Sequence, residues 1–139
     1  MDASLTRTTV LLIDPHKEDR EYWTQRLNVS SPDYVVLEAD TGKGGLLICH
    51  QQRIECVLVE VSLPDMSGFE VLVKLVPRVH HPEIAVIILT RLALYPMGDL
   101  AIKNGAQEYL VKAYISGDDL AWAIQKAMFA VAFKKADHD

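Results

Sequence analysis

Four side chains with complementary chemistry each stand at the end of an apolar, β-branched-rich run of the sequence. They are Asp14, Glu60, Thr90 and Lys112. Two carboxylates can bind a hard cation, and a lysine with a hydroxyl can bind phosphoryl oxygens. Parallel strands in one sheet would bring these four groups together in a single pocket. On spacing alone, a surface salt bridge from Lys112 to Glu60 or Asp14 explains the pattern better than a working site.

The runs that precede these residues have the composition of parallel strands covered on both faces. They cover residues 9–13, 34–39, 56–61, 85–90 and, more weakly, 109–111. Segments of helical length lie between and after them, among them residues 18–29, 42–52 and 67–76. Strand and helix alternate five times with short connections, which predicts a doubly wound (βα)5 α/β sandwich of the flavodoxin-like type.

Two of the helical segments carry local signals that make specific predictions. In the first, Tyr22, Trp23 and Leu27 fall on one apolar stripe, as in an amphipathic helix. In the third, Ser67 and Glu70 have the spacing of a capping box, so this helix should begin directly after Ser67.

Composition limits the classes of function that the chain can have. The 139 residues carry a net charge of −5, and half of them are hydrophobic, so we expect one domain over 1–139 with its core at about 8–133 and no nucleic-acid partner. No apolar run reaches the roughly 20 residues of a membrane span, and no secretory signal opens the chain. We expect a cytoplasmic protein with no membrane contact, in which Cys49 and Cys56 are buried free thiols.

Longer stretches around the four polar residues resemble the receiver domain of response regulators in two-component signalling. The motifs that carry the resemblance are "LPDMSG" and "GAQEYLVK", and the matching stretches are residues 10–20, 57–68, 86–91 and 105–114. The resemblance implies a five-stranded parallel sheet with strand order 2-1-3-4-5. It also implies that a kinase histidine passes a phosphoryl group to an aspartate after the third strand. Paired acids after the first strand then hold Mg²⁺, while a Ser/Thr and a Lys contact the phosphoryl oxygens.

Part of the family's site is present in this sequence. By position, Thr90 and Lys112 match the residues that contact the phosphoryl oxygens, and Asp14 matches one of the paired acids. Tyr109 matches the strand-five aromatic residue that moves together with the Thr when receivers switch. The resemblance therefore implies a signalling module that acts through protein contacts and is not an enzyme.

Three positions depart from the family's pattern, and all three belong to the same site. The second acid falls on Pro15, the acceptor aspartate on Glu60, and the proline after the lysine on Ala113. Glutamate displaces the carboxylate by about 1.5 Å, and phosphoryl transfer is sensitive to such errors. Asp14, Glu60 and the backbone carbonyl of Ser62 would make at most a weak Mg²⁺ site, so no cofactor is required. A non-proline cis bond is costly, so the peptide after Lys112 should be trans.

These departures suggest a pseudo-receiver that phosphorylation does not switch. In one form of this hypothesis, a Glu60–Lys112 pair imitates the phosphorylated state; in the other, Glu60 is a tolerated relic. The first alternative is a working receiver with weak Mg²⁺-dependent phosphorylation at Glu60. The second is a small-molecule sensor on a flavodoxin-like fold, although no Gly-rich phosphate loop follows the first strand.

The segment before the fifth strand predicts a short or late fourth helix. Pro96 and Gly98 stand where this helix should begin, so we expect it to start near Asp99 after an apolar loop. The apolar residues of this loop, which either bind a partner or pack onto the sheet, are Leu92, Leu94, Tyr95 and Met97.

The last helix, expected over about 117–136 with Ser116 or Asp118 as its cap, carries two apolar stripes. The stripe expected to face the core consists of Leu120, Ile124, Ala127, Met128 and Val131. The opposite stripe consists of Trp122, Phe129 and Phe133, which predicts a protein partner: a sensor kinase, an output domain or a second copy in a homodimer. Alternatively, some of these aromatic residues fold back over the domain's own surface.

Overall fold

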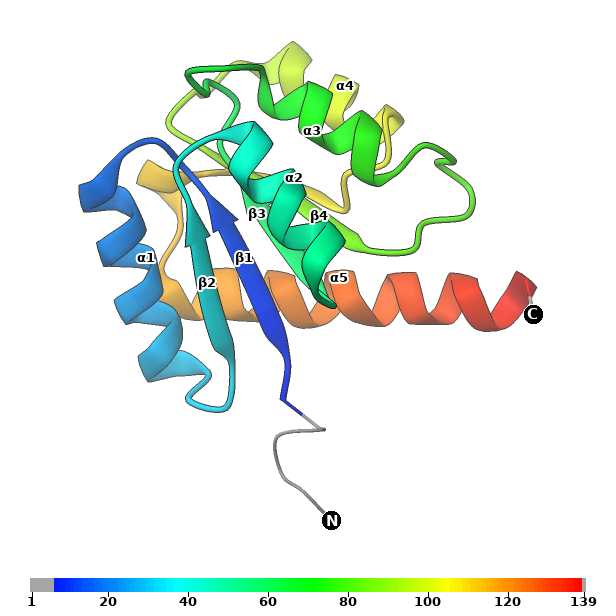
Figure 1. The fold of residues 1–139 in the computed structure, drawn as a ribbon, viewed down its shortest axis with the longest axis horizontal. Coiled ribbons are helices and arrows are strands. Elements are labelled where there is room, and N and C mark those ends of the chain that lie inside the picture. Colours follow the sequence, from blue (N-terminus) through cyan, green and yellow to red (C-terminus); the bar gives the residue numbers. More distant parts are fainter. Residues whose placement is uncertain (1–6, 139) are drawn as a thin grey trace.

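The computed structural model describes residues 7–138 and shows a parallel sheet covered by helices on both faces (Figure 1). The strand order β2-β1-β3-β4-β5 confirms the predicted topology. The strands are β1 (Thr9–Ile13), β2 (Val35–Ala39), β3 (Cys56–Val59), β4 (Ala85–Thr90) and β5 (Glu108–Val111). The helices are α1 (Lys17–Ser30), α2 (Gly42–Gln51), α3 (Gly68–Leu75), α4 (Tyr95–Lys103), the 3₁₀ turn η2 (Lys112–Tyr114) and α5 (Gly117–His138).

Parallel pairing brings the carboxyl ends of the strands to one edge of the sheet. In the sheet, Ile13 pairs with Val59, Val59 with Ile88, and Thr90 with Val111. Residues that directly follow β1, β3 and β5, and the last residue of β4, therefore lie close together. The chain thus positions its polar strand-end residues by strand register rather than by long loops.

The core consists of two apolar clusters, one on each face of the sheet. Alternate strand residues point to opposite faces: Val10 and Leu12 join one cluster, and Leu11 and Ile13 join the other. The first cluster is closed by α1 and α5, and the second by α2, α3 and α4. The continuous apolar strands follow from this double coverage.

The first helix buries only part of its predicted apolar stripe. Trp23 and Leu27 are buried, but Tyr22 is 45% exposed and lies at the edge of the stripe. The Tyr22 ring packs edge-on against Trp23, 4.9 Å between centroids, and the guanidinium of Arg26 lies 5.1 Å from its centre. These two contacts cover part of the Tyr22 ring while the side chain stays at the surface.

Helix boundaries confirm two predicted caps and correct one predicted start. The Oγ of Ser67 accepts from the Glu70 N–H at 3.2 Å, and the Oγ of Ser116 accepts from the Asp119 N–H at 3.1 Å. The predicted late start of α4 near Asp99 is wrong, because α4 begins at Tyr95. Pro96 lies in its first turn, where a missing N–H costs nothing and the fixed φ favours the helix.

Helix α5 carries its core stripe as predicted. Leu120, Ile124, Ala127 and Val131 are buried, and Met128 is partly buried against the same cluster. The helix ends at His138, two residues beyond the predicted end. Within residues 7–138, no helix is long and apolar enough to cross a membrane.

The two cysteines are free thiols, as predicted. Cys56 is fully buried and Cys49 is partly buried. Burial raises the pKa of Cys49 to about 11 and raises that of Cys56 further. Both therefore behave as small apolar side chains.

Candidate functional site

The Lys112 ammonium lies at the centre of a cluster of carboxylates at the carboxyl edge of the sheet. Its Nζ lies 2.5 Å from Asp14 Oδ2, 2.7 Å from Asp19 Oδ2 and 3.0 Å from Glu60 Oε1. The lysine side chain is only 8% exposed, and Asp14 is fully buried. An ammonium has three donors, and three carboxylates accept them here. Spacing alone predicted a surface salt bridge from Lys112 to Glu60 or Asp14. The structure instead shows a buried cluster in which Lys112 contacts both of these acids and Asp19 as well.

The carboxylate of Glu60 has partners at both of its oxygens. Oε2 accepts from the Val61 N–H at 2.6 Å and from the Thr90 hydroxyl. Oε1 accepts from the Arg91 N–H at 3.1 Å and from Lys112. The side chain is buried, so these contacts offset the large cost of placing a carboxylate away from water. Thr90, Lys112 and Glu60 therefore form one unit, as their strand-end positions predicted.

The loop after β3 fixes the backbone beneath this carboxylate. The Glu60 N–H donates to the Ile13 carbonyl at 2.9 Å, and the Gly68 N–H donates to the Val61 carbonyl at 2.7 Å. A Cβ at Gly68 would lie 2.3 Å from the Glu60 carbonyl oxygen. Only glycine lets the start of α3 approach so closely, which explains the glycine that ends "LPDMSG".

Sequence reasoning missed Asp19 and Arg91. Arg91 binds Asp19 through two hydrogen bonds, 2.9 Å from Nε and 3.1 Å from a terminal nitrogen. Asp19 comes from the first turn of α1, and Arg91 directly follows Thr90. One signal in the sequence could have pointed to this pair. Asp19 lies in the first helical turn after Asp14, and Arg91 directly follows the fourth strand, so both lie near the carboxyl edge of the sheet.

Charge pairing sets the ionisation of the cluster. Burial raises the pKa of Glu60, but the bonds from Thr90, Lys112 and the Arg91 N–H outweigh it and leave that pKa below its ordinary value. Burial lowers the pKa of Lys112, but its three carboxylate partners leave it raised. The Arg91 hydrogen bond, with help from Lys112, lowers the pKa of Asp19 to about 2. Glu60, Lys112 and Asp19 are therefore all charged at neutral pH.

The residues present do not fit the Mg²⁺ ion that the family's site holds. Asp14 Oδ1 accepts from the His16 N–H at 2.9 Å, its Oδ2 binds Lys112, and both Glu60 oxygens are occupied. Pro15 offers no side-chain oxygen, and Mg²⁺ demands near-octahedral oxygen ligation. A cation at Asp14 and Glu60 would have to displace the Lys112 ammonium. Within residues 7–138, no three His, Cys, Asp or Glu side chains are arranged so that they could hold a metal ion.

A chain of hydrogen bonds leads from the cluster to Tyr109. The Thr90 hydroxyl donates to Glu60, and its oxygen accepts from the Leu92 N–H at 3.1 Å. The Leu92 carbonyl in turn accepts from the Tyr109 hydroxyl at 2.7 Å. The predicted switch pair, Thr90 and Tyr109, is thus linked through the backbone of one intervening residue.

The segment after Lys112 has the backbone expected when alanine replaces the family's proline at position 113. Residues 112–114 form the short turn η2, and no cis peptide bond occurs within residues 7–138, which confirms the predicted trans peptide. Ala113 and Lys112 line a cavity of about 320 Å³ beside the cluster.

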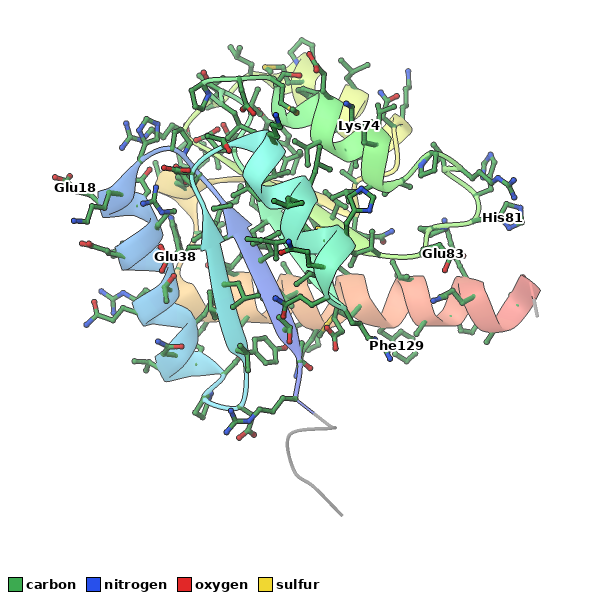
Figure 2. The ribbon with its side chains drawn as sticks, in the orientation of Figure 1. Glu18, Glu38, Lys74, His81, Glu83 and Phe129 are labelled. Carbon is green, nitrogen blue, oxygen red and sulfur yellow. The ribbon has the colours of Figure 1, made fainter. Side chains whose placement is uncertain are left out.

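The predicted second stripe of α5 is exposed along its length. Trp122 is 63%, Phe129 72% and Phe133 65% exposed, and the two phenylalanine rings stack 6.4 Å apart. Figure 2 shows Phe129 on the side of α5 that faces away from the sheet. The alternative, in which these aromatics fold back over the domain, is not what the structure shows. In the segment before α4, Leu92 and Leu94 are exposed and Met97 is partly buried, whereas the side chain of Tyr95 lies outside the described part of the structure.

Comparisons with known proteins identify the family. The family model described as "Response regulator receiver domain" matches residues 10–125. Histidine kinase P4 of Formosa agariphila is 28% identical over 108 residues, which are 78% of this chain and 8% of that protein. A probable cyclic di-GMP phosphodiesterase of Vibrio cholerae is 31% identical over 108 residues, 78% of this chain and 24% of that protein. The chain spans less than two thirds of the length of these curated relatives.

Solved structures agree with the family match. The crystal structure of a response regulator receiver domain protein from Clostridium thermocellum has a TM-score of 0.79 and 29% identity to this chain. The alignment covers 91% of this chain and 98% of that one. With the family model covering most of the residues and the fold in agreement, the chain belongs to the response regulator receiver domain family of two-component signalling.

Proposed function

We propose that this chain is a pseudo-receiver: a receiver domain that phosphorylation does not switch and that acts through protein contacts rather than turnover. The observation that carries the proposal is the placement of the Lys112 ammonium between Asp14 and Glu60, 2.5 Å and 3.0 Å from their oxygens. An internal cation neutralises both carboxylates where the family's site would hold Mg²⁺. With a hydrogen-bond donor already at each Asp14 and Glu60 oxygen and no second acid at Pro15, the pocket is poor in the ligands that phosphoryl transfer needs.

We further propose that Glu60 imitates the phosphorylated acceptor rather than remaining as a relic. Its carboxylate accepts from Thr90 and Lys112, the two residues that contact phosphoryl oxygens in the family. It also accepts from the Arg91 N–H and is connected through Leu92 to Tyr109. A carboxylate has about half to two-thirds of a phosphate's charge, but burial strengthens each of these bonds.

The α5 aromatic face, defined as Trp122, Phe129 and Phe133, is the proposed surface for a protein partner. Aromatic residues that are solvated on a free domain are enriched in interfaces, where each gains by losing contact with water. A sensor kinase, an output domain or a second copy of the chain would suit this face. A structure named as the dimer of the beryllofluoride-activated NtrC4 receiver domain shares the fold, at 21% identity.

The test is a titration of Mg²⁺ and beryllofluoride into the protein, followed by amide NMR. We expect no saturable shift at Glu60, Thr90, Tyr109 or Lys112 at millimolar Mg²⁺. A matched variant, Pro15→Asp/Glu60→Asp, restores the family's acids and serves as the responsive control. Saturable shifts in the unmodified protein would support a working receiver with weak phosphorylation at Glu60 and would overturn the pseudo-receiver proposal.

A further inference from the structure

We infer that Asp19 is an internal carboxylate that closes a latent oxyanion site between the side chains of Lys112 and Arg91. The inference rests on the proposed function, because it explains what keeps the Lys112 ammonium unavailable to phosphoryl oxygens. It adds two residues, Asp19 and Arg91, that have no counterpart among the site positions derived from the resemblance.

The geometry is that of one anion held by two cations. Asp19 Oδ2 lies 2.7 Å from Lys112 Nζ and 2.9 Å from Arg91 Nε, and Asp19 Oδ1 lies 3.1 Å from the other guanidinium nitrogen. The two-pronged contact with arginine is the arrangement by which arginine also binds phosphate. Asp19 thus makes the contacts that a small tetrahedral oxyanion could make.

There is room for such an ion beside the cluster. A cavity of about 320 Å³ is lined by Lys112, Arg91 and Asp19, with Trp23 and Ala113 among its other walls. Its outer part is accessible, because the Arg91 side chain is 53% exposed. Entry therefore requires only that Asp19 leave its two cations.

Charge balance explains why the site is closed at present. Asp14, Asp19 and Glu60 contribute three negative charges, and Lys112 and Arg91 two positive ones, so the cluster has a net charge of −1. A further anion is repelled by this excess and finds every Lys112 donor in use. Neutralising Asp19 brings the cluster to zero charge and replaces its charge-assisted bonds to one lysine donor and two guanidinium donors with weaker ones, for which an anion can compete.

The experiment compares Asp19→Asn with a matched control, Glu18→Gln, during titration with inorganic phosphate at constant ionic strength. Glu18 lies on the same first turn of α1, is exposed, and points outward from the α1 ribbon in Figure 2. Amide NMR monitors Arg91, Lys112 and Ala113. We expect saturable shifts in Asp19→Asn with a midpoint on the order of 1 mM, as two charge-assisted contacts allow. The unmodified protein and Glu18→Gln should show none.

Two further variants keep the inference falsifiable. Asp19→Asn/Arg91→Gln should bind phosphate at least tenfold more weakly than Asp19→Asn alone, and Asp19→Ser repeats the test if the asparagine variant loses its native spectrum. An absence of binding in both folded Asp19 variants, or equal binding by the unmodified protein, overturns the inference. The Mg²⁺ and beryllofluoride titration of the unmodified protein does not depend on these variants, so the two proposals fail separately.

Discussion

The carboxyl edge of the sheet and the α5 aromatic face place their side chains in opposite environments. At the edge, the charged side chains Asp14, Glu60 and Lys112 are buried and satisfy one another. On α5, the large aromatic side chains of Trp122, Phe129 and Phe133 are left 63–72% exposed to water. On the proposed function, the first arrangement fixes the pocket in one state, and the second offers apolar surface to a partner. The contrast teaches that the charged groups of the pocket are satisfied within the domain, whereas the aromatic side chains of α5 are not covered by it.

Removing the central cation should have the largest effect. We expect Lys112→Met to lower the free energy of unfolding by about 3–5 kcal/mol, because it leaves buried carboxylates uncompensated. The matched control is Lys126→Met on α5, whose Nζ lies 3.3 Å from Glu108 Oε1 at the surface and should cost at most about 0.5 kcal/mol. Urea denaturation measures both, and equal losses would erase the contrast between the two regions.

Adding a methyl group beneath the cluster should have the second-largest effect, and adding one away from it should have the opposite sign. Gly68→Ala places a Cβ 2.3 Å from the Glu60 carbonyl oxygen and should cost about 2–3 kcal/mol. Gly98→Ala, within α4, places a Cβ in ordinary contact with the Tyr109 ring, 3.6 Å from its Cδ1, and should instead stabilise the protein by about 0.5–1 kcal/mol. Thermal unfolding of both variants is the measurement, and a stable Gly68→Ala protein would show that the backbone below Glu60 is loosely held.

Acid should weaken the cluster through Asp19. Its pKa is about 2 in the folded state and 3.8 in the reference state, so the native protein binds fewer protons here. The stabilisation is complete above pH 3.8 and is lost as the pH falls toward 2. It amounts to about 1–2 kcal/mol after allowance for solvent screening. Unfolding followed from pH 5 to pH 2 should show this loss, and Asp19→Asn should remove it while Glu18→Gln does not.

Changes to the α5 aromatic face should have the smallest effect on stability. We expect Trp122→Gln/Phe129→Gln to change the free energy of unfolding by less than about 0.5 kcal/mol, because neither ring packs into the core. The same variant should weaken self-association or partner binding, which sedimentation at rising protein concentration measures. A loss of more than about 2 kcal/mol would show that these rings stabilise the chain's own fold.

Strand and helix positions were largely predictable because the β-branched runs and the Ser67 cap act locally. The start of α4 was not, because Pro96 ends a helix in one position and begins one in another, and only the path after β4 decides between them. The Glu60–Lys112 contact followed from strand order. The role of Asp19 did not, because it depends on the angle of α1 and on the side-chain conformation of Arg91.

The mimic form of the proposal requires that the charge of Glu60, and not only its shape, be transmitted to the surface of β5. Glu60→Gln keeps the shape and removes the charge that Lys112 and Thr90 hold. The exposed Glu70→Gln on α3 removes the same charge without touching the cluster and is the matched control.

The most direct measurement is therefore the amide NMR spectrum of Glu60→Gln beside those of Glu70→Gln and the unmodified protein. The account predicts that the resonances of Thr90, Leu92 and Tyr109 move in Glu60→Gln and stay in place in Glu70→Gln. A Glu60→Gln spectrum that changes only at residues in direct contact with the side chain, with Tyr109 unmoved, would contradict the account and leave Glu60 as a relic in a fixed scaffold.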